Sequence, residues 1–139
     1  MTETNAPYAL AVKALIVNTA KNQILLVKRR LKDVHSPGVW EVPGGRLVTG
    51  EDPFDGLKRE TREEAGLEIE IHQPLDVRHF TRDDGQQITL IIFLCSPFTN
   101  DIALSEEHTE YEWVHAEEAK ERIHPSFLSA IAVWEKHYR

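Results

Sequence analysis

The stretch GRLVTGEDPFDGLKRETREEAGL, residues 45–67, decides the fold because it marks out a helix at both ends. Asp52 is of the type that caps a helix, Pro53 suits the first helical position, and Gly66 suits the residue just past the end. These signals predict a helix over residues 53–65. Apolar or small residues recur along it at steps of three and four, which predicts a buried face packed against a sheet. The members of this face are Phe54, Leu57, Thr61 and Ala65.

Apolar runs on both sides of this helix predict the strands of that sheet. The predicted strands are residues 8–17 and 24–27, which form a β-hairpin, then 39–42, 67–80, 88–95 and 110–114. Pro43, Gly44 and Gly45 are predicted to stop any strand. Further helices are predicted over residues 117–122 and 126–138. This order predicts an α+β (α/β) fold, a helix-sheet-helix sandwich around a mixed β-sheet, and the length predicts one domain over residues 1–139.

The composition limits what the chain binds and where it acts. With 23 acidic against 16 basic residues, the formal charge of −7 argues against binding to nucleic-acid polymers, which requires Lys and Arg to neutralise phosphates. Cys95 is the only cysteine and lies in an apolar run, which favours a buried thiol and a reducing, cytoplasmic location. Residues 1–7 lack the basic start of a secretory signal, and no apolar stretch reaches the length of a membrane span.

Three glutamates of the predicted helix, Glu60, Glu63 and Glu64, fall on one face of it, away from the apolar stripe. Folding does not require this arrangement, because like charges repel and the C-terminal half of a helix disfavours anions. A divalent cation would turn the repulsion into ligation, since Mg²⁺ and Mn²⁺ bind carboxylate oxygens and keep positions for water and phosphate. The alternative is a solvated helix face, in which Arg59 pairs with Glu63 and Glu60 pairs with Arg62 or Lys58.

The stretch as a whole resembles the signature of the Nudix family in its MutT-like form. The residues that match the signature are Gly45, Glu51, Arg59, Glu60, Glu63, Glu64, Gly66 and Leu67. Thr61 stands where the family usually has an aliphatic residue, at a position that faces the core. The flanking segments VWEVPGG, QQITLIIFLC and EYEWV also resemble MutT-like members. A Nudix-type fold is therefore expected.

This resemblance implies a pyrophosphohydrolase that uses Mg²⁺ or Mn²⁺ to cleave a diphosphate linkage in a nucleoside diphosphate joined to another group. It implies that Glu60, Glu63 and Glu64 are metal ligands and that the Gly45 carbonyl is a further one. The alternative is a Nudix-fold nucleotide-binding or regulatory module without turnover, which would usually lack some of these glutamates. The expected partner is a small nucleotide-like molecule, and the sequence favours neither a monomer nor a homodimer.

The resemblance also implies supporting residues around the metal. Glu51 and Arg59 would act on the ligands indirectly, with Arg59 paired to a carboxylate and holding its rotamer. Glu107 lies where MutT-like members place an extra metal-binding glutamate, although its acidic neighbours also fit a plain charged surface. Glu107 and Glu60 are the two candidates for the general base.

Three residues are candidates for substrate binding. Arg29 and Arg30 close a predicted strand facing opposite ways, so one of them is expected to reach the phosphates unless both are a solvated strand end. Trp40 is suited to stack on a base, although a tryptophan beside a glycine turn more often belongs to the core. The marks of several Nudix subfamilies, including the ADP-ribose and diadenosine polyphosphate hydrolases, are absent, which leaves oxidised nucleotides as the expected substrate class by elimination.

Overall fold

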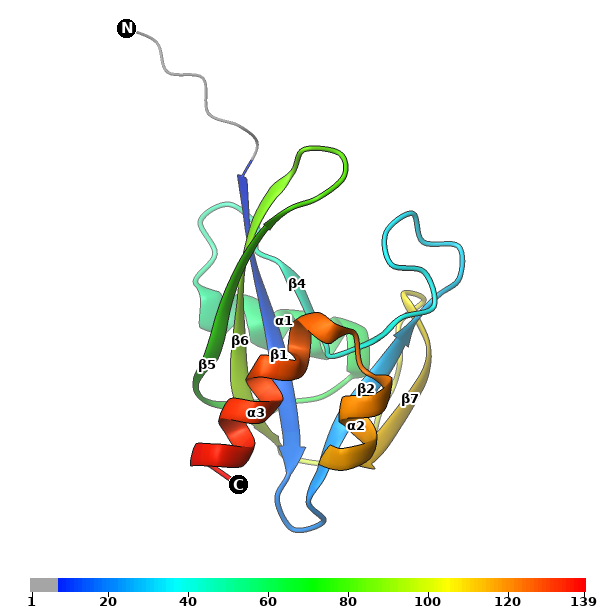
Figure 1. Cartoon of the computed structure of the whole chain (residues 1–139), viewed down its shortest axis with the longest axis vertical. Helices are drawn as coiled ribbons and strands as arrows, with labels where there is room; N and C mark the ends of the chain where they lie inside the picture. The colour runs from blue at the N-terminus through cyan, green and yellow to red at the C-terminus, as the bar shows by residue number, and fades with distance from the viewer. Residues whose placement is uncertain (1–7) are drawn as a thin grey trace, which may run out of the picture.

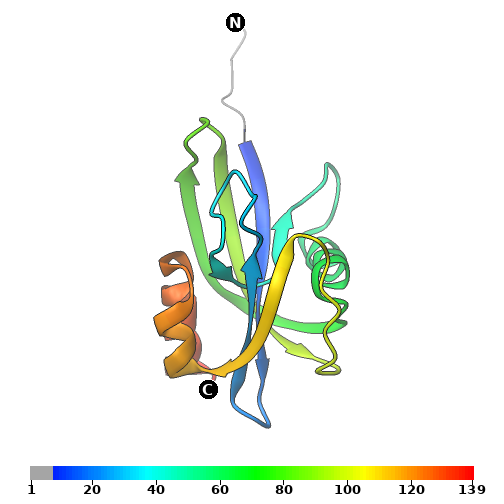
Figure 2. The same ribbon diagram turned by 90° about the vertical axis from the view of Figure 1, so that its right-hand side faces the viewer.

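Helices cover both faces of a mixed sheet in the computed structural model, which describes residues 8–139 (Figures 1 and 2). Helix α1 (Pro53–Ala65) lies on one face, and α2 (Ala116–Arg122) with α3 (Leu128–His137) lies on the other. The predicted α+β helix-sheet-helix sandwich is confirmed. The expectation about a secretory signal at residues 1–7 lies outside the described residues. None of the helices within residues 8–139 has the length and apolar character needed to span a bilayer.

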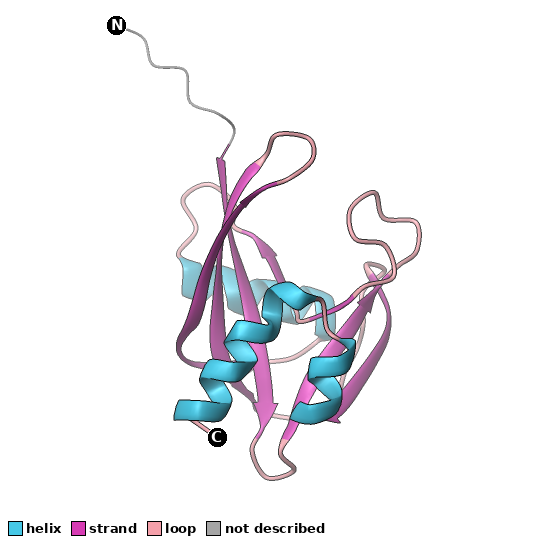
Figure 3. Ribbon diagram, in the orientation of Figure 1, coloured by secondary structure: helices cyan, strands magenta, loops and turns pink. Residues whose placement is uncertain are grey.

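The strands, which Figure 3 draws in magenta, belong to one sheet. This seven-stranded sheet has the order β3-β2-β1-β6-β5, with β4 also paired to β1 and β7 to β2. Their bounds are β1 Tyr8–Asn18, β2 Gln23–Arg29, β3 Trp40–Glu41, β4 Gly44–Arg46, β5 Ile69–Thr81, β6 Gln87–Pro97 and β7 His108–His115. β6 runs parallel to β1, while the other paired strands are antiparallel. The sheet is therefore mixed, as predicted.

The ends of α1 are those that the sequence predicts. The Asp52 carboxylate accepts hydrogen bonds from the N–H groups of Phe54 and Asp55 at 2.8 and 3.2 Å. Pro53 takes the first helical position, and Gly66 follows the last turn with a φ of 66°, in the left-handed region. Both ends are stabilised by the chemistry of their own residues, so the helix is placed accurately from sequence alone.

The buried face of α1 matches its prediction except at its first residue. Leu57, Thr61 and Ala65 are fully buried, and the Thr61 hydroxyl donates to a backbone carbonyl one turn back at 3.0 Å. The polar atom at this core position therefore has a partner. The prediction that Phe54 is buried was wrong, because its side chain is 50% exposed beside a surface groove and rests against the Phe93 ring.

The predicted hairpin of β1 and β2 is present but short. The two strands pair at only two positions, beside their connecting turn. Further along they diverge, and residues 39–46 lie between them, with β3 paired to β2 and β4 paired to β1. The Val39 carbonyl accepts from the Arg29 N–H at 2.9 Å, and the Pro43 carbonyl accepts from the Ala14 N–H at 2.8 Å. This crossing segment (residues 39–46) therefore satisfies backbone groups of both strands.

β3 ends at Glu41, before Pro43, but the prediction that Gly44 and Gly45 also stop any strand was wrong. Gly44 begins β4 and lies opposite Lys13 of β1. Its φ is 137°, a region that side chains rarely adopt, and a Cβ there would lie 2.1 Å from the Val12 carbonyl oxygen. Glycine does not break the strand here, because the absence of a side chain is what lets the backbone of β4 lie against β1.

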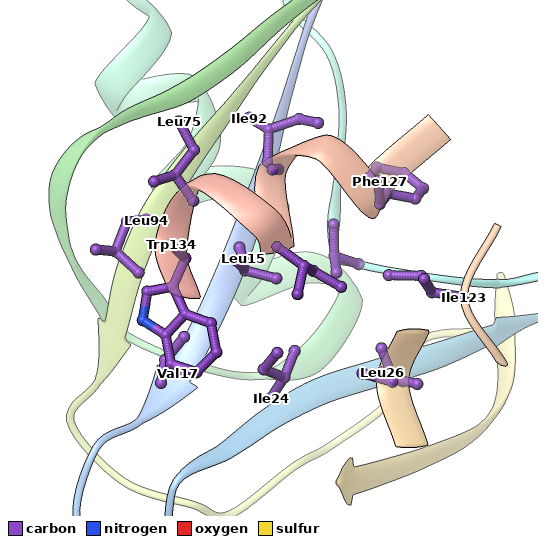
Figure 4. Packing of buried hydrophobic residues seen from close by; sticks show 14 of the residues in the cluster. Leu15, Val17, Ile24, Leu26, Leu75, Ile92, Leu94, Ile123, Phe127 and Trp134 are labelled. Carbon is purple, nitrogen blue, oxygen red and sulfur yellow. The ribbon is translucent and has the colours of Figure 1, made fainter. Parts of the chain in front are cut away.

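Alternate residues of the central strands supply two cores, one on each face of the sheet. Leu15 and Ile24 pack with Trp134 of α3, as Figure 4 shows. The adjacent residues Ile16 and Leu25 point the opposite way and pack in the core beneath α1. The sheet thus separates an α1 core from an α3 core.

The remaining elements differ little from their predicted bounds. β7 begins two residues earlier than predicted, at His108. The last helix was predicted over residues 126–138, but Pro125–Phe127 form a 3₁₀ turn and α3 begins at Leu128. Cys95 is buried as expected, and burial raises the pKa of its thiol.

We expect Gly44→Ala to lower the free energy of unfolding by about 3 kcal/mol or more, because the new Cβ meets backbone atoms and the φ is unfavourable. Gly50→Ala is the matched control. It also has a positive φ, of 82°, but a Cβ there meets nothing within 4 Å, so it should cost only about 1 kcal/mol. Urea unfolding of both variants measures the difference, and equal losses would contradict the close packing of β4 on β1.

Candidate metal-binding cleft and neighbouring pocket

Glu64, in the last turn of α1, ties this helix to β4. Its buried carboxylate accepts a hydrogen bond from the Gly44 backbone N–H at 2.7 Å. Burial raises the pKa of the Glu64 carboxyl to about 8, and the carboxylates of Glu60 and Glu107 act in the same direction. The charge of Lys13 and the Gly44 N–H oppose this rise without cancelling it. A nearby cation would stabilise the ionised form of such a group.

Arg59 forms hydrogen bonds to three other carboxylates, one before α1 and two within it. It forms two parallel hydrogen bonds to Glu51, from Nε at 2.7 Å and from Nη2 at 2.9 Å. It also donates to Glu63 at 3.0 Å and to Glu60 at 3.1 Å. The hydrogen bond from Arg59 lowers the pKa of Glu51, whereas burial raises the pKa of Glu60 despite Arg59. Arg59 is therefore the counter-charge that holds three of these carboxylates together.

A cleft of about 340 Å³ opens beside the C-terminal half of α1. Its lining residues are Arg30, Glu60, Glu63, Glu64, Ser105, Glu106 and Glu107. The structure thus brings Glu107, from the loop before β7, to the three glutamates of α1. The Glu107 carbonyl also accepts from the Arg30 N–H at 3.2 Å, which anchors this loop beside the end of β2.

The donor set of this acidic cleft fits Mg²⁺ or Mn²⁺, because it consists of carboxylate oxygens, two of which belong to groups whose pKa burial raises. Within residues 8–139, however, no three His, Cys, Asp or Glu side chains form a ready-made metal site. The reason is that Glu60 and Glu63 point to Arg59 and Glu64 points to Gly44. A metal ion in this cleft would compete with Arg59 and the Gly44 N–H for these carboxylates.

Gly45 lies directly beside one of the proposed ligands. A Cβ at this position would stand 3.0 Å from Glu60 Oε2, so glycine lets the backbone of β4 approach that carboxylate. The Gly45 backbone is thus close to the acidic cleft, as its proposed role as a carbonyl ligand requires.

The structure separates the three candidates for substrate binding. Arg30 lines the acidic cleft, and its Nε donates to Asp33 at 2.6 Å. Arg29 turns the other way, with Nη2 at 3.1 Å from Asp33 and Nη1 at 3.4 Å from Glu41. Trp40 does not line the acidic cleft but packs against the α3 core. The Arg122 Cζ atom lies 4.4 Å from the centre of its ring. The structure therefore supports the core interpretation of Trp40.

A second cavity, of about 390 Å³, lies on the α3 side of the sheet and is mainly apolar. Its lining residues are Lys13, Ser36, Val39, Glu41, Arg78, His79, Phe80, Leu90, His124, Ser126 and Phe127. We call it the apolar pocket. The loop after β2 and the β5–β6 hairpin lie at the same end of the molecule and both contribute to it (Figure 1). Its size and lining suit a flat ring bounded by a few polar groups.

Glu41 stands between charged groups of three other strands. Lys13 Nζ of β1 lies 3.0 Å from Glu41 Oε1, while His108 Nε2 of β7 lies 2.9 Å from Oε2. Burial alone would raise the pKa of Glu41, but Lys13, His108 and Arg29 outweigh it and lower the pKa to about 2. We call Lys13, Arg29, Glu41 and His108 the Glu41 cluster. Its carboxylate is ionised at any physiological pH.

Sequence reasoning missed the Glu41 cluster. Lys13 and Glu41 fall inside the predicted strands 8–17 and 39–42, and no role is predicted from the sequence for them or for His108. The available signal was one charged residue within each of two otherwise apolar strands. Their pairing could not be seen, because Lys13 and Glu41 are 28 residues apart and Glu41 and His108 are 67 apart.

Comparisons with known proteins agree with this geometry. A family model described as the NUDIX domain matches residues 7–132. The chain is 31% identical to a "MutT-like protein" of Streptomyces ambofaciens over 87% of its length and 74% of the relative's. It is 35% identical to an "8-oxo-dGTP diphosphatase" of Proteus vulgaris over 67% of its length and 81% of the relative's. By contrast, it spans only 42% of the plant relative "Nudix hydrolase 7" of Arabidopsis thaliana.

The fold matches solved structures as well. The crystal structure of a MutT protein from Methanosarcina mazei Go1 superposes with a TM-score of 0.83 and 26% identity, covering 99% of this chain and 100% of that one. Proteins of the matched family generally use a divalent metal ion. The acidic cleft is where the present chain has the oxygen donors for such an ion.

We expect the unfolding free energy of the metal-free protein to fall relative to that of Glu64→Gln as the pH rises from about 5 to 8. The folded-state pKa of Glu64, about 8, lies above its ordinary value of 4.5, so the stability of its neutral form is present below 4.5 and is lost as the pH rises through 8. The slope should approach about 1.4 kcal/mol per pH unit. Denaturant unfolding with EDTA measures it.

Glu63→Gln is the control for this measurement, because the Glu63 side chain is 59% exposed and should show a much smaller trend. Mg²⁺ should restore the stability of the wild-type protein at pH 8 but not add as much to Glu64→Gln. A constant difference between wild type and Glu64→Gln across this range would contradict the buried, proton-binding state of Glu64.

Proposed function

This chain belongs to the Nudix family and is a MutT-like hydrolase, and from this we propose that it cleaves a diphosphate linkage in a nucleoside diphosphate joined to another group. The observation that supports the proposal is one cleft lined by Glu60, Glu63, Glu64 and Glu107, with Arg30 at its edge. A diphosphate is anionic, so it requires cations to bind beside four carboxylates. Arg30 and divalent metal ions would supply them.

Mg²⁺ or Mn²⁺ is the proposed cofactor, and it would neutralise charge that develops on the phosphate oxygens during attack by water. Glu60, Glu63 and Glu64 are proposed as its ligands, with Glu107 and the Gly45 carbonyl as further ones. The proximity of Gly45 to Glu60 and the shared cleft of the four glutamates support this set.

Arg59 and Glu51 are proposed as positioning residues. The two parallel hydrogen bonds between them fix the guanidinium, and its remaining N–H groups hold Glu60 and Glu63 near the cleft. Glu51 would keep Arg59 in place if Glu60 and Glu63 were to bind a metal ion.

Glu107 and Glu60 remain the two candidates for the general base. Both line the cleft, and both act on the same buried carboxyl of Glu64. Burial raises the pKa of Glu60, which improves its ability to accept a proton near neutral pH. Glu107 comes from a loop, so its carboxylate is less constrained by the helix.

The apolar pocket is the proposed site of the nucleoside. Phe80, Leu90 and Phe127 provide apolar walls for a base, while Ser126 and His124 provide polar groups at its edge. The similarity to an "8-oxo-dGTP diphosphatase" supports deoxynucleoside triphosphates, oxidised ones included, as the substrate class. The proposal includes a single domain over residues 1–139 acting in the cytoplasm on this small molecule, without a nucleic-acid polymer or a membrane as partner.

A substrate panel tests the reaction. Release of phosphate or pyrophosphate would be measured with Mg²⁺ and separately with Mn²⁺, using deoxynucleoside triphosphates, oxidised nucleotides, ADP-ribose, NADH, nucleotide sugars and dinucleoside polyphosphates. We expect turnover of at least one oxidised or ordinary deoxynucleoside triphosphate in preference to the other classes. Turnover of ADP-ribose or NADH alone would overturn the proposed substrate class, and no turnover with metal bound would overturn the proposed reaction.

We expect Glu63→Gln to lower kcat at least 100-fold, about 2.7 kcal/mol in activation free energy, because it removes a charged metal ligand. Its thermal stability should change little, since the side chain is 59% exposed. Glu68→Gln is the matched control, being 58% exposed and paired with Arg62 just past the same helix. Steady-state kinetics with Mg²⁺ measures both variants, and similar kcat values would exclude Glu63 as a ligand.

A further inference from the structure

Lys13 is a buried cation in a strand that is otherwise apolar around it. Its side chain is only 12% exposed, whereas lysine side chains are usually solvated. Its Nζ donates to Glu41 Oε1 at 3.0 Å and to the Val42 carbonyl at 3.2 Å. A lysine ammonium has three N–H donors, so these contacts leave one free.

The Glu41 cluster holds Lys13 in place, and its one carboxylate is shared between Lys13 and Arg29. Glu41 is the acceptor for Lys13 and Arg29 together, and it also contacts His108. The cluster therefore has two permanent positive charges around a single carboxylate. Asp33 contacts Arg29 and Arg30 but is not a partner of Lys13. Lys13 therefore shares the Glu41 carboxylate with Arg29.

Lys13 lines the apolar pocket but not the acidic cleft. Lys13 and Glu41 both line the apolar pocket. The positive charge of Lys13 also acts on Glu60 and Glu64, which line the acidic cleft. It partly opposes the rise that burial causes in the pKa of each carboxyl. A molecule that fills the apolar pocket would therefore contact the side chain of Lys13.

We propose that Lys13 is a substrate-binding residue, whose Nζ donates its remaining hydrogen bond to an oxygen of the ligand in the apolar pocket. This inference rests on the proposed function, because the ligand is taken to be a nucleotide. The oxygen is either a phosphate oxygen next to the sugar or a carbonyl of the base, since both accept hydrogen bonds from an ammonium group. Glu41 is then a positioning residue, which fixes the direction of Lys13.

The test uses Lys13→Met, which keeps the length of the side chain and removes the charge and donors. Binding of dAMP and dGMP to the whole protein would be measured in EDTA by NMR titration, so that metal ligation does not contribute. We expect Lys13→Met to weaken the binding of at least one of them tenfold or more. Lys28→Met is the matched control, because Lys28 lies on β2 in a surface pair with Glu110, and it should change neither affinity more than twofold.

The two nucleotides identify the acceptor, because guanine carries a carbonyl and adenine does not. Equal weakening for both supports contact with the phosphate, and weakening for dGMP alone supports contact with the base. Unchanged affinity for both in Lys13→Met would overturn the inference and leave the proposed function intact. If wild type binds neither nucleotide in EDTA or with Mg²⁺, both the inference and the nucleotide-hydrolase proposal fall.

A second variant keeps the test valid if Lys13→Met leaves Glu41 without sufficient counter-charge and the protein unfolds. Lys13→Met combined with Glu41→Gln removes one charge of each sign, so the net charge of the cluster is unchanged. If Lys13 binds the ligand, the double variant also loses at least tenfold in affinity. A folded double variant with wild-type affinity would show that Lys13 has only a structural role.

Discussion

The Gly44 N–H donates to the Glu64 carboxylate over 2.7 Å, and through this contact the geometry of α1 is transmitted to the sheet. The contact depends on β4 lying against β1, which in turn depends on a residue without a side chain beside the Val12 carbonyl. Because β1 and β2 pair only near their turn, the crossing segment has room to pass between them. Its residues then face three ways, toward the carboxylates of α1, toward the apolar pocket and toward β2. The backbone of the crossing segment therefore determines where the acidic cleft and the apolar pocket lie relative to the sheet.

Two charge arrangements of opposite sense lie on either side of this path. Beside the acidic cleft, Arg59 is surrounded by Glu51, Glu60 and Glu63. In the Glu41 cluster, one carboxylate is surrounded by basic groups. The first arrangement has carboxylates in excess and attracts metal cations, while the second has cations in excess and attracts oxygen acceptors. The nucleotide and metal ion of the proposed function would carry both kinds of group.

The helix and its carboxylates were predictable from sequence because their determinants are local. Asp52, Pro53 and Gly66 set the ends of α1 within a few residues of each other, and the glutamate spacing of three and four places those side chains on one face. β4 was not predictable, because Gly44 usually signals a break and its pairing depends on Lys13, which lies 31 positions earlier in the chain. The Glu41 cluster was not predictable for the same reason, because its members lie on four different strands and come together only in the folded sheet.

Trp40 shows a different limit of sequence reasoning. Its place beside the glycine turn is compatible with base stacking and with the core. Its packing against the α3 core, with Arg122 of α2 over its ring, depends on residues far along the chain. The apolar pocket was likewise invisible, because its walls come from the loop after β2, from β5 and β6, and from the 3₁₀ turn before α3. Cavities formed by segments distant in sequence have no local pattern.

The sheet that separates the α1 core from the α3 core also separates the proposed tasks of the molecule. The carboxylates project from the α1 side, whereas the walls of the apolar pocket belong to the α3 side. Substitutions on opposite faces share few neighbours, so their effects on stability should add independently. A substitution in a wall of the apolar pocket should therefore leave the carboxylates of the acidic cleft in place. Lys13 is the exception, because it lines the apolar pocket and its charge acts on Glu60 and Glu64. Substitutions at Lys13, or at its partner Glu41, should therefore affect both faces.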